Sequence, residues 1–346
     1  MIRYRAGSIG VLMLLAVPLV AAAGDEVVRI GAWGWILDAP TKVADGAGLF
    51  AAGRSEASPE RIEVVDVGSG VEAIAALEQG RLDFALAAQA PVARSLLLQA
   101  ESIRATNPSF VILASLALAP RAHYLIADGS RGIRIPADLE GRRLGILRHS
   151  SAHFAWQQFA RQHGLDPAGV ELVDVTLPDQ ALALTEGRVD AIVAWDPWSG
   201  RLLRELGAKG VVFGMREFYS ANWLLLARTQ LVDQRPAVAD RVLAAYAAAL
   251  ALMDGDRARA RGLHAAALGL DPAELAPLED GVIWQLGLGW SVLSSLEAAL
   301  DWLAAEPEFA GRPRPRTAPF IDAGPMLRVA PESLALPSYL TRTATR

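Results

Sequence analysis

Residues 141–153 of this 346-residue chain read GRRLGILRHSSAH, and this stretch decides the predicted fold. The apolar run Leu144–Leu147 is typical of a buried strand, and the pattern that follows is typical of a helix. Hydroxyl side chains at Ser150 and Ser151 suit the start of such a helix, whose free backbone N–H groups attract an anion. The stretch therefore predicts an α/β unit with an anion-binding turn.

A second strand, Val189–Ala194, ends in the sequence Trp195-Asp196-Pro197-Trp198. Ligands of open α/β sheets lie at the carboxyl ends of the strands. This turn and the turn at Ser150 are therefore expected to form two walls of one ligand site. Trp33 and Trp35 follow the first strand in a glycine-spaced loop and are expected at the same edge.

Helix–strand alternation over the first two thirds of the chain predicts sheets with helices on both faces. The predicted strands are 27–32, 61–67, 82–87, 111–118, 124–127, 144–147, 170–175, 189–194, 211–213 and 223–227. The predicted helices are 40–50, 71–79, 92–100, 152–163, 180–186 and 199–206, and, beyond Gln230, 237–253, 257–267, 272–285 and 292–304.

Two lobes are expected, because the pattern predicts that the chain crosses between them near residues 119–124 and again near 218–223. Each lobe is predicted to be a mixed, mostly parallel sheet flanked by helices, with the ligand in the cleft. The predicted division is 25–120 plus 220–310 for lobe 1, 121–219 for lobe 2, and 311–346 for an irregular proline-rich tail. No internal repeat is evident.

The first 23 residues have the pattern of a secretory signal peptide. Arg3 and Arg5 precede the apolar run Ile9–Val20, and three alanines at 21–23 supply a cleavage site. The run is shorter than the ~20 residues of a spanning helix, which argues against the alternative of a membrane anchor. No other stretch reads as long and apolar enough to cross a membrane. A periplasmic location is therefore predicted.

The chain has no cysteine, which excludes a lipid anchor, disulfides, cysteine nucleophiles and cysteine metal clusters. Its net charge is −5, and no stripe of lysine or arginine is present, which argues against a nucleic-acid partner. The sequence also lacks a P-loop, a G-x-G-x-x-G turn, a G-x-S-x-G turn and an H-E-x-x-H helix. A non-catalytic protein without a cofactor is therefore predicted.

Each residue of the predicted anion-binding turn also has a purely structural interpretation. Ser150 and Ser151 can be ordinary helix N-caps, and Arg148 can be a solvated arginine instead of a ligand contact. His149 and His153 lie four residues apart, a spacing that suits a metal on a helix face. No third ligand is near them in sequence, so hydrogen bonding or packing is preferred for His153 and no metal is predicted.

The tryptophan and aspartate candidates leave two interpretations open as well. Asp196 accepts hydrogen bonds and repels a simple anion, so it indicates either a zwitterionic ligand or the N-cap of a helix that starts at Pro197. Trp33 and Trp35 either contact the ligand or pack between the lobes. Together with the tryptophans at 195 and 198, they also permit cation–π binding of an ammonium group.

Five segments between about Val27 and about Ala304 carry a family resemblance. They are 40–50, the A-L-x-x-G-x-x-D unit within 70–84, the I-x-x-x-x-D-L-x-G unit within 133–143, Ser150–His153, and G-x-V-D-A at 187–191 with W-D-P at 195–197. In this order and spacing, the chain resembles the periplasmic substrate-binding proteins of ABC importers for taurine and aliphatic sulfonates. The wider group includes nitrate-binding and thiamine-precursor-binding proteins.

The resemblance implies a two-lobed type II binding fold that closes on its ligand by a hinge. It also implies a monomer that docks on a membrane permease with its ATPase. By resemblance, the ligand site comprises Ser150, Ser151 and His153, with Trp195 and Asp196 on the opposite wall and Gly70, Gln89 and Ala90 in the first-lobe turns.

Four departures from the family pattern bear on the ligand. His149 stands where sulfonate binders often have glycine, and Ala152 replaces a hydroxyl residue. Gln89-Ala90 replaces small or hydroxyl residues, and Trp33 and Trp35 enlarge the first loop. These differences favour an aromatic or bulky compound with an anionic head.

The predicted function is an extracytoplasmic solute receptor for an alkyl or aryl sulfonate. The alternatives in the same class are a binder of nitrate, a carboxylate or a pyrimidine-type thiamine precursor. A sensor that reports to a membrane receptor is a further alternative. The fold also resembles a desulfinase and pyrimidine-synthesising proteins, but those relatives depend on cysteine, which this chain lacks.

Overall fold

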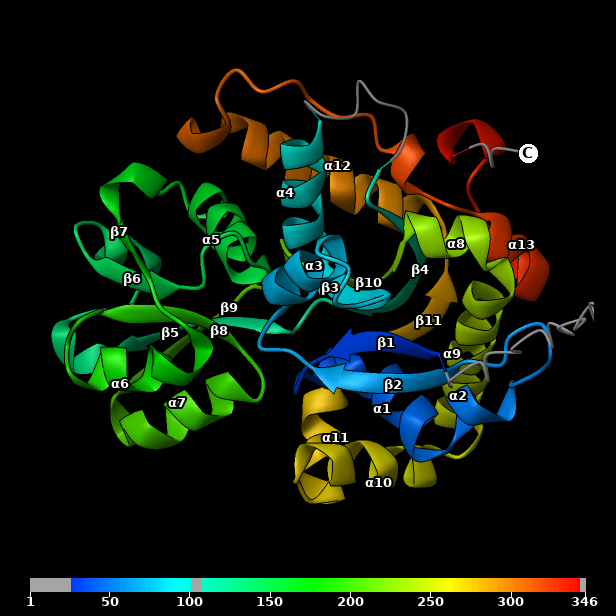
Figure 1. The fold of residues 1–346 in the computed structure, drawn as a ribbon. Coiled ribbons are helices and arrows are strands. Elements are labelled where there is room, and N and C mark those ends of the chain that lie inside the picture. The colour runs from blue at the N-terminus through cyan, green and yellow to red at the C-terminus, as the bar shows by residue number, and fades with distance from the viewer. Residues whose placement is uncertain (1–25, 101–107, 343–346) are drawn as a thin grey trace, which may run out of the picture.

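The computed structural model describes residues 26–100 and 108–342, so the predicted signal peptide lies outside the described residues. Two β-sheets, each flanked by helices, form two lobes (Figure 1). The green segments of Figure 1 make one lobe, and the first and last parts of the described chain make the other. The chain passes to the second lobe between Ala119 and His123 and returns between Gly214 and Ala221.

The strands are β1 Val27–Ala32, β2 Arg61–Asp66, β3 Phe84–Ala88, β4 Phe110–Ala119, β5 His123–Asp128, β6 Arg143–Ile146, β7 Glu171–Asp174, β8 Ala191–Trp195, β9 Gly210–Gly214, β10 Ala221–Arg228 and β11 Ile283–Gly287. The helices are α1 Ala39–Gly46, α2 Leu49–Ala52, α3 Gly70–Glu78, α4 Gln89–Gln99, α5 Ser151–Gln162, α6 Gln180–Thr185, α7 Trp198–Leu206, α8 Thr229–Gln234, α9 Pro236–Gly255, α10 Arg257–Leu268, α11 Pro272–Glu279, α12 Trp290–Ala305 and α13 Gly324–Val329.

The described part of the chain forms a six-stranded sheet in the order β11-β4-β10-β3-β1-β2 and a five-stranded sheet in the order β7-β6-β8-β5-β9. Strands joined through helices run parallel: β1 with β2 and β3, and β6 with β7 and β8. The strands next to the crossings pair antiparallel, because the chain enters them from the other lobe. The sheets are mixed as predicted, but antiparallel pairs are at least as frequent as parallel ones, which corrects the expectation of mostly parallel pairing.

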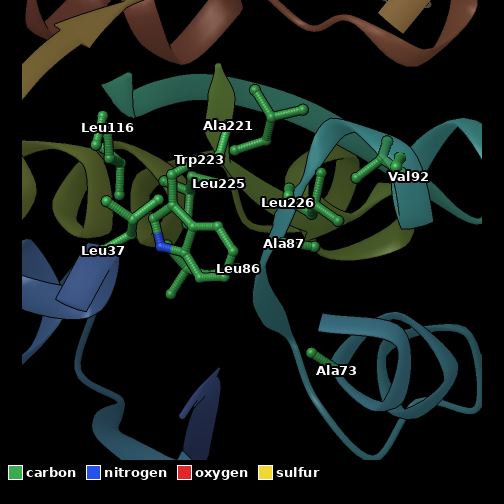
Figure 2. Packing of buried hydrophobic residues seen from close by; sticks show 14 of the residues in the cluster. Leu37, Ala73, Leu86, Ala87, Val92, Leu116, Ala221, Trp223, Leu225 and Leu226 are labelled. Atoms are coloured by element: carbon green, nitrogen blue, oxygen red, sulfur yellow. The ribbon is translucent and has the colours of Figure 1, made fainter. Parts of the chain in front are cut away.

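The core of the first lobe surrounds the central strands of its sheet. The apolar run of β4 is buried along nearly its whole length, as expected of a strand covered on both faces. Figure 2 shows Trp223, Leu225 and Leu226 of β10 together with Leu86 and Ala87 of β3, the strand with which β10 pairs. Burying one such leucine contributes roughly 1.5–3 kcal/mol. The core thereby fixes the strand ends that carry the site.

Helix α9 corrects the expectation that no further segment has the length and apolar character of a membrane span. Its 20 residues, Pro236–Gly255, meet that description by length and composition alone. Half of its most apolar window is buried inside the protein, where it packs with α1, α2, α8, α10 and α13. This packing is that of a core helix.

Two expectations about the C-terminal third were wrong. The helix expected over 272–285 stops at Glu279, and the chain turns at Gly281, whose φ is 80°, into strand β11. The strand forms because the aromatic and β-branched residues that follow pair with β4. Residues beyond 311 are no irregular tail: they contain α13, and the buried Phe320 and Ile321 pack in the core of the first lobe.

One hydrogen-bonding arrangement occurs in both lobes, although no repeat was expected. In a G-R-x-D sequence of the first lobe, Asp83 accepts hydrogen bonds from the backbone N–H of Arg29, at 2.9 Å, and from the side chain of Arg228, at 2.6 Å. In the same sequence of the second lobe, Asp190 accepts from the backbone N–H of Arg143, at 2.9 Å, and from its side chain. Each carboxylate thus joins a helix–strand turn to the neighbouring strand.

Replacing Asp190 with asparagine should destabilise the second lobe. Burial opposes the charge of Asp190, but the hydrogen bonds from Arg143 and Arg131 outweigh it and hold the pKa below its usual value. We expect Asp190→Asn to lower the free energy of unfolding at pH 7 by about 1–3 kcal/mol. The difference from wild type should shrink as the pH falls through the lowered pKa, because the carboxyl then loses its charge.

Urea unfolding at several pH values would measure this effect. The matched control is Glu205→Gln, which removes an exposed ion pair with Arg201 and should change stability by less than ~0.5 kcal/mol. Equal losses in the two variants would contradict a special role for Asp190.

Candidate functional site

A small cavity lies between the two lobes, at the carboxyl ends of β1, β3, β6 and β8. Its volume is about 10 Å³, which is roughly the space of one water molecule. The side chains of both lobes thus nearly fill the cleft. The residues that line it are Trp33, Trp35, Ser69, Gly70, Val71, Ala88, Pro91, Leu147, Ser150, Ser151, Trp195 and Trp223.

Four indole rings occupy most of this cleft. Trp33 and Trp35 come from the loop after β1, Trp223 comes from β10, and Trp195 ends β8 on the other lobe. The ring centroids of Trp35 and Trp223 are 4.8 Å apart, and Trp195 lies 5.7 Å from both Trp33 and Trp35. All four side chains are buried. Trp198, expected in this cluster, does not line the cavity, and Trp223 is present in its place.

The carboxylate of Asp38 holds two of these tryptophans. It accepts hydrogen bonds from the backbone N–H of Trp33, at 2.6 Å, and from the indole N–H of Trp223, at 3.2 Å. Burial raises the pKa of Asp38 from 3.8 to about 7, against the lowering effect of these bonds and of Lys42. The ammonium of Lys42 is itself 3.1 Å from Asp66. An acid that titrates near neutral pH therefore lies directly behind the cleft.

His123 connects the second-lobe wall to the turn before α5. Its Nε2 lies 2.9 Å from the hydroxyl of Ser151, and its ring contacts Trp35, Trp195 and Tyr219. Burial lowers the pKa of His123 to about 3, so the imidazole is neutral. Its Nδ1 is buried without a hydrogen-bond partner.

The turn before α5 places a helix N-terminus beside the cavity, and anion binding there stays a prediction. Helix α5 begins at Ser151, and both Ser150 and Ser151 line the cavity. The hydroxyl of Ser150 accepts from the N–H of Ala152, at 3.1 Å, and donates to the carbonyl of Leu147, at 2.6 Å. Ser150 is therefore an N-cap. The φ of His149 is 59°, in the left-handed region, which explains why glycine suits this position.

Three further residues of this turn lie outside the cavity lining. His149 Nε2 is 3.1 Å from a carboxylate oxygen of Glu308, on the other lobe. The ring of His153 packs edge to face on Trp302 of α12, with centroids 4.9 Å apart. Arg148 donates to a backbone carbonyl of β7. In this conformation, His149 and His153 hold the two lobes together.

Of the predicted site residues of the first-lobe turns, one lines the cavity and two do not. Gly70 lines the cavity at the start of α3. Gln89 instead holds the returning crossing: its amide accepts from the N–H of Asn222 and donates to the carbonyl of Ser220, both at 2.9 Å. Ala90 is fully buried behind it. Gln89 and Ala90 thus support the wall of the cleft from behind.

Asp196 is not the N-cap that was one of its two interpretations, because α7 begins at Trp198 and its N-cap is Pro197. Its carboxylate accepts a hydrogen bond from the hydroxyl of Ser199, in the first turn of α7. Burial raises the pKa of Asp196, against this hydrogen bond. Asp196 also lines a second interlobe cavity of about 110 Å³, together with Trp35 and Tyr124. It therefore lies beside the tryptophan cluster, since Trp35 lines both cavities.

Four residues of the site were not predicted: Asp38, His123, Tyr219 and Trp223. Trp223 was assigned to a strand, and nothing in its sequence indicates which face it lies on. Asp38 and His123 are polar residues next to strand and helix ends. Their burial could be foreseen only from the packing of both lobes. Within the residues that the structure describes, no group of three metal-ligating side chains occurs.

The two lobes with a cavity between them have the arrangement of a type II periplasmic binding fold. A family model described as NMT1/THI5 like matches residues 61–256, and the chain belongs to this family. The solved alkanesulfonate-binding protein SsuA of Xanthomonas axonopodis pv. citri, bound to MOPS, is 21% identical. It has a TM-score of 0.69, and the likeness covers 87% of this chain and 99% of that protein. This likeness confirms the predicted fold class.

Two curated relatives match part of the chain. A protein of Escherichia coli K12 named for binding aliphatic sulfonates is 27% identical over 161 residues, which is 46% of this chain and 50% of that protein. A 2′-hydroxybiphenyl-2-sulfinate desulfinase of Rhodococcus erythropolis is 29% identical over 229 residues, which is 50% of this chain and 61% of the enzyme. The chain thus spans about half to three fifths of these relatives.

Asp38 should make stability depend on pH. Its pKa is about 7 in the folded protein and near 3.8 when unfolded, so ionising it costs the folded state free energy as the pH rises between these values. The amide of Asp38→Asn does not ionise in this pH range, so the variant does not lose this free energy. Relative to wild type, we expect the variant to gain on the order of 4 kcal/mol between pH 4 and pH 8.

The measurement is urea unfolding of both proteins at several pH values. Only the difference between the two proteins is diagnostic, because acidification also protonates His123 and His153. Both are buried and neutral, so their protonation destabilises the folded state as the pH falls, which opposes the effect of Asp38. A difference that stays constant with pH would contradict the raised pKa of Asp38.

Proposed function

We propose that this protein is a periplasmic receptor that captures a small organic anion, an alkyl or aryl sulfonate, between its lobes. The boundaries between the lobes lie at the two crossings. The protein acts as a monomer and delivers the ligand to an ABC permease and its ATPase. The proposal extends to this chain what the names of the Escherichia coli relative and of SsuA say of those proteins.

The observation that carries the proposal is a set of neutral hydrogen-bond donors around one cavity. The indole N–H groups of Trp33 and Trp195 are buried without a partner. The first turns of α3 and α5 present Gly70 and Ser151 to the same space. A buried donor without a partner costs about 1–3 kcal/mol. A ligand with several acceptor oxygens would recover this free energy by accepting hydrogen bonds from these donors. Helix N-termini bind anions in other proteins in the same way.

A sulfonate suits these donors because it has three acceptor oxygens on one tetrahedral centre and stays ionised at all physiological pH values. Nitrate and carboxylates have planar heads with fewer acceptor directions. They remain the alternatives in the same class, with pyrimidine-type thiamine precursors. A sensory role would use the same site.

A desulfinase activity is the alternative from a different class, and the site does not favour it. Ser151 and His123 are hydrogen-bonded like a nucleophile and its base. A histidine with a pKa of about 3 is a weak base, and its Nδ1 has no partner to orient it. The chain also has no cysteine nucleophile. Binding without chemistry is therefore the better supported function.

A thermal-shift screen of the protein tests the ligand class. The panel should contain taurine, alkyl and aryl sulfonates, sulfate esters, nitrate, dicarboxylates and pyrimidines. A ligand at a hundred times its Kd adds about 2.7 kcal/mol of stability and raises Tm by a few degrees. We expect shifts with sulfonates. Shifts confined to another head group would overturn the proposed ligand.

Ser151→Ala should weaken sulfonate binding by about 1–3 kcal/mol, because it removes a hydroxyl from the anion-binding turn. Isothermal titration calorimetry with the best sulfonate of the screen measures the change. The control is Ser294→Ala, an exposed serine on α12 that should leave the affinity unchanged. Unchanged affinity in folded Ser151→Ala would exclude this role.

A further inference from the structure

The tryptophan cluster is built from both walls of the cleft, so a bound ligand must separate its members. Trp33, Trp35 and Trp223 belong to the first lobe, and Trp195 belongs to the second. The contacts of Trp195 with Trp33 and Trp35 are therefore the ones that a ligand would replace. A group held between these rings would touch indole surface on several sides at once.

The angles between the rings favour a compact group over a flat one. Trp33 and Trp35 are nearly parallel, at 23°, but both come from the same loop. Across the cleft, Trp195 is inclined by 71° to Trp33 and by 50° to Trp35. A flat aromatic ring stacked on one wall would meet the other wall with its edge. Inclined faces instead surround a roughly spherical group.

Two carboxyl groups lie next to the cluster, and the cations beside it are already paired. Arg121, which lines the adjacent cavity with Trp35 and Asp196, is 3.0 Å from a carboxylate oxygen of Asp280. Among the described residues, the cavity lining contains no lysine or arginine. Asp38 lies directly behind Trp33 and Trp223, and Asp196 follows Trp195 in the sequence. The ionisable groups that face Asp38 are Lys42, whose ammonium is paired with Asp66, and the buried hydroxyl of Tyr246. This environment favours positive charge at the rings.

From this geometry we infer that the ligand is a zwitterion: its trimethylammonium-type group lies among Trp33, Trp35, Trp195 and Trp223, and its anionic head binds at the Ser151 turn. Indole faces attract such cations within about 6 Å of the ring centroid. The inference rests on the proposed function for its anionic head. It replaces the aromatic body that the sequence favoured with a compact cationic one.

Binding of this zwitterion has a distinct proton signature. A cation near Asp38 stabilises its ionised form, and part of the Asp38 population is protonated at pH 7. The protein should therefore release protons when the zwitterion binds. A ligand with negative charge alone should cause uptake of protons, because it favours the protonated carboxyl.

The test compares two isosteric probes by isothermal titration calorimetry at pH 7. The first is N,N,N-trimethyltaurine, and the second is 3,3-dimethylbutane-1-sulfonate, in which carbon replaces the ammonium nitrogen. We expect the first probe to bind about tenfold more tightly or better. Titrations in phosphate and in Tris, whose ionisation enthalpies differ, measure proton release. Asp38→Asn should abolish that release.

Matched variants locate the cation. Trp195→Leu should reduce the affinity ratio of the two probes several-fold. Trp290→Leu changes an exposed tryptophan at the start of α12 and should leave the ratio unchanged. Circular dichroism confirms that each variant is folded. If Trp195→Leu left the ratio unchanged while folded, the assignment of the cation to this cluster would be overturned.

The outcomes separate this inference from the proposed function. Equal or tighter binding of the uncharged isostere, or proton uptake with the zwitterion, overturns the inference and leaves the sulfonate receptor standing. Binding of glycine betaine, a trimethylammonium carboxylate, without binding of either sulfonate keeps the cation and overturns the sulfonate head. If none of these three compounds binds while other sulfonates raise Tm in the thermal-shift screen, the inference of a zwitterionic ligand is overturned and the proposed sulfonate receptor stands.

Discussion

The geometry of the cleft depends on one buried carboxylate. Asp38 is fully buried, and it accepts hydrogen bonds from the loop after β1 and from the indole of β10. These two bonds set the relative positions of Trp33 and Trp223 and thereby one wall of the site. Burial favours the neutral form of Asp38, whereas the hydrogen bonds from Trp33 and Trp223 favour its ionised form. The wall is therefore both well defined and sensitive to charge in the cleft.

The lobes meet through two kinds of contact that differ in their chemistry. Indole rings and His123 meet inside the cleft, whereas His149, His153 and Phe154 meet Glu308 and Trp302 at its rim. The inner contacts are those that a ligand would replace. The contacts at the rim involve the same turn that presents Ser151. Motion of α5 on opening would therefore move the proposed anion-binding turn and the rim contacts together.

Sequence predicted the large features of this molecule well, for definite reasons. Alternating patterns located most strands and helices, and the run before Ser150 led correctly to a helix N-terminus at the cleft. Prediction from the sequence failed where contacts between distant segments determine the secondary structure or the burial of a residue. β11 was taken as helix because its pairing partner, β4, is more than 150 residues away in sequence. Asp38 and His123 became site residues only when two lobes enclosed them.

The C-terminal segment has a consequence for the order in which the chain can fold. Ile321 forms a bridge with Ile112, and Arg342 pairs with Asp322 and Asp233, so the last described residues complete the first lobe. The second lobe uses one continuous stretch of chain, whose contacts are closer in sequence and form sooner. The first lobe stays unfinished until the segment that contains Ile321 and Arg342 is available. Until then its apolar strands lack part of their cover, and transiently exposed apolar surface favours aggregation.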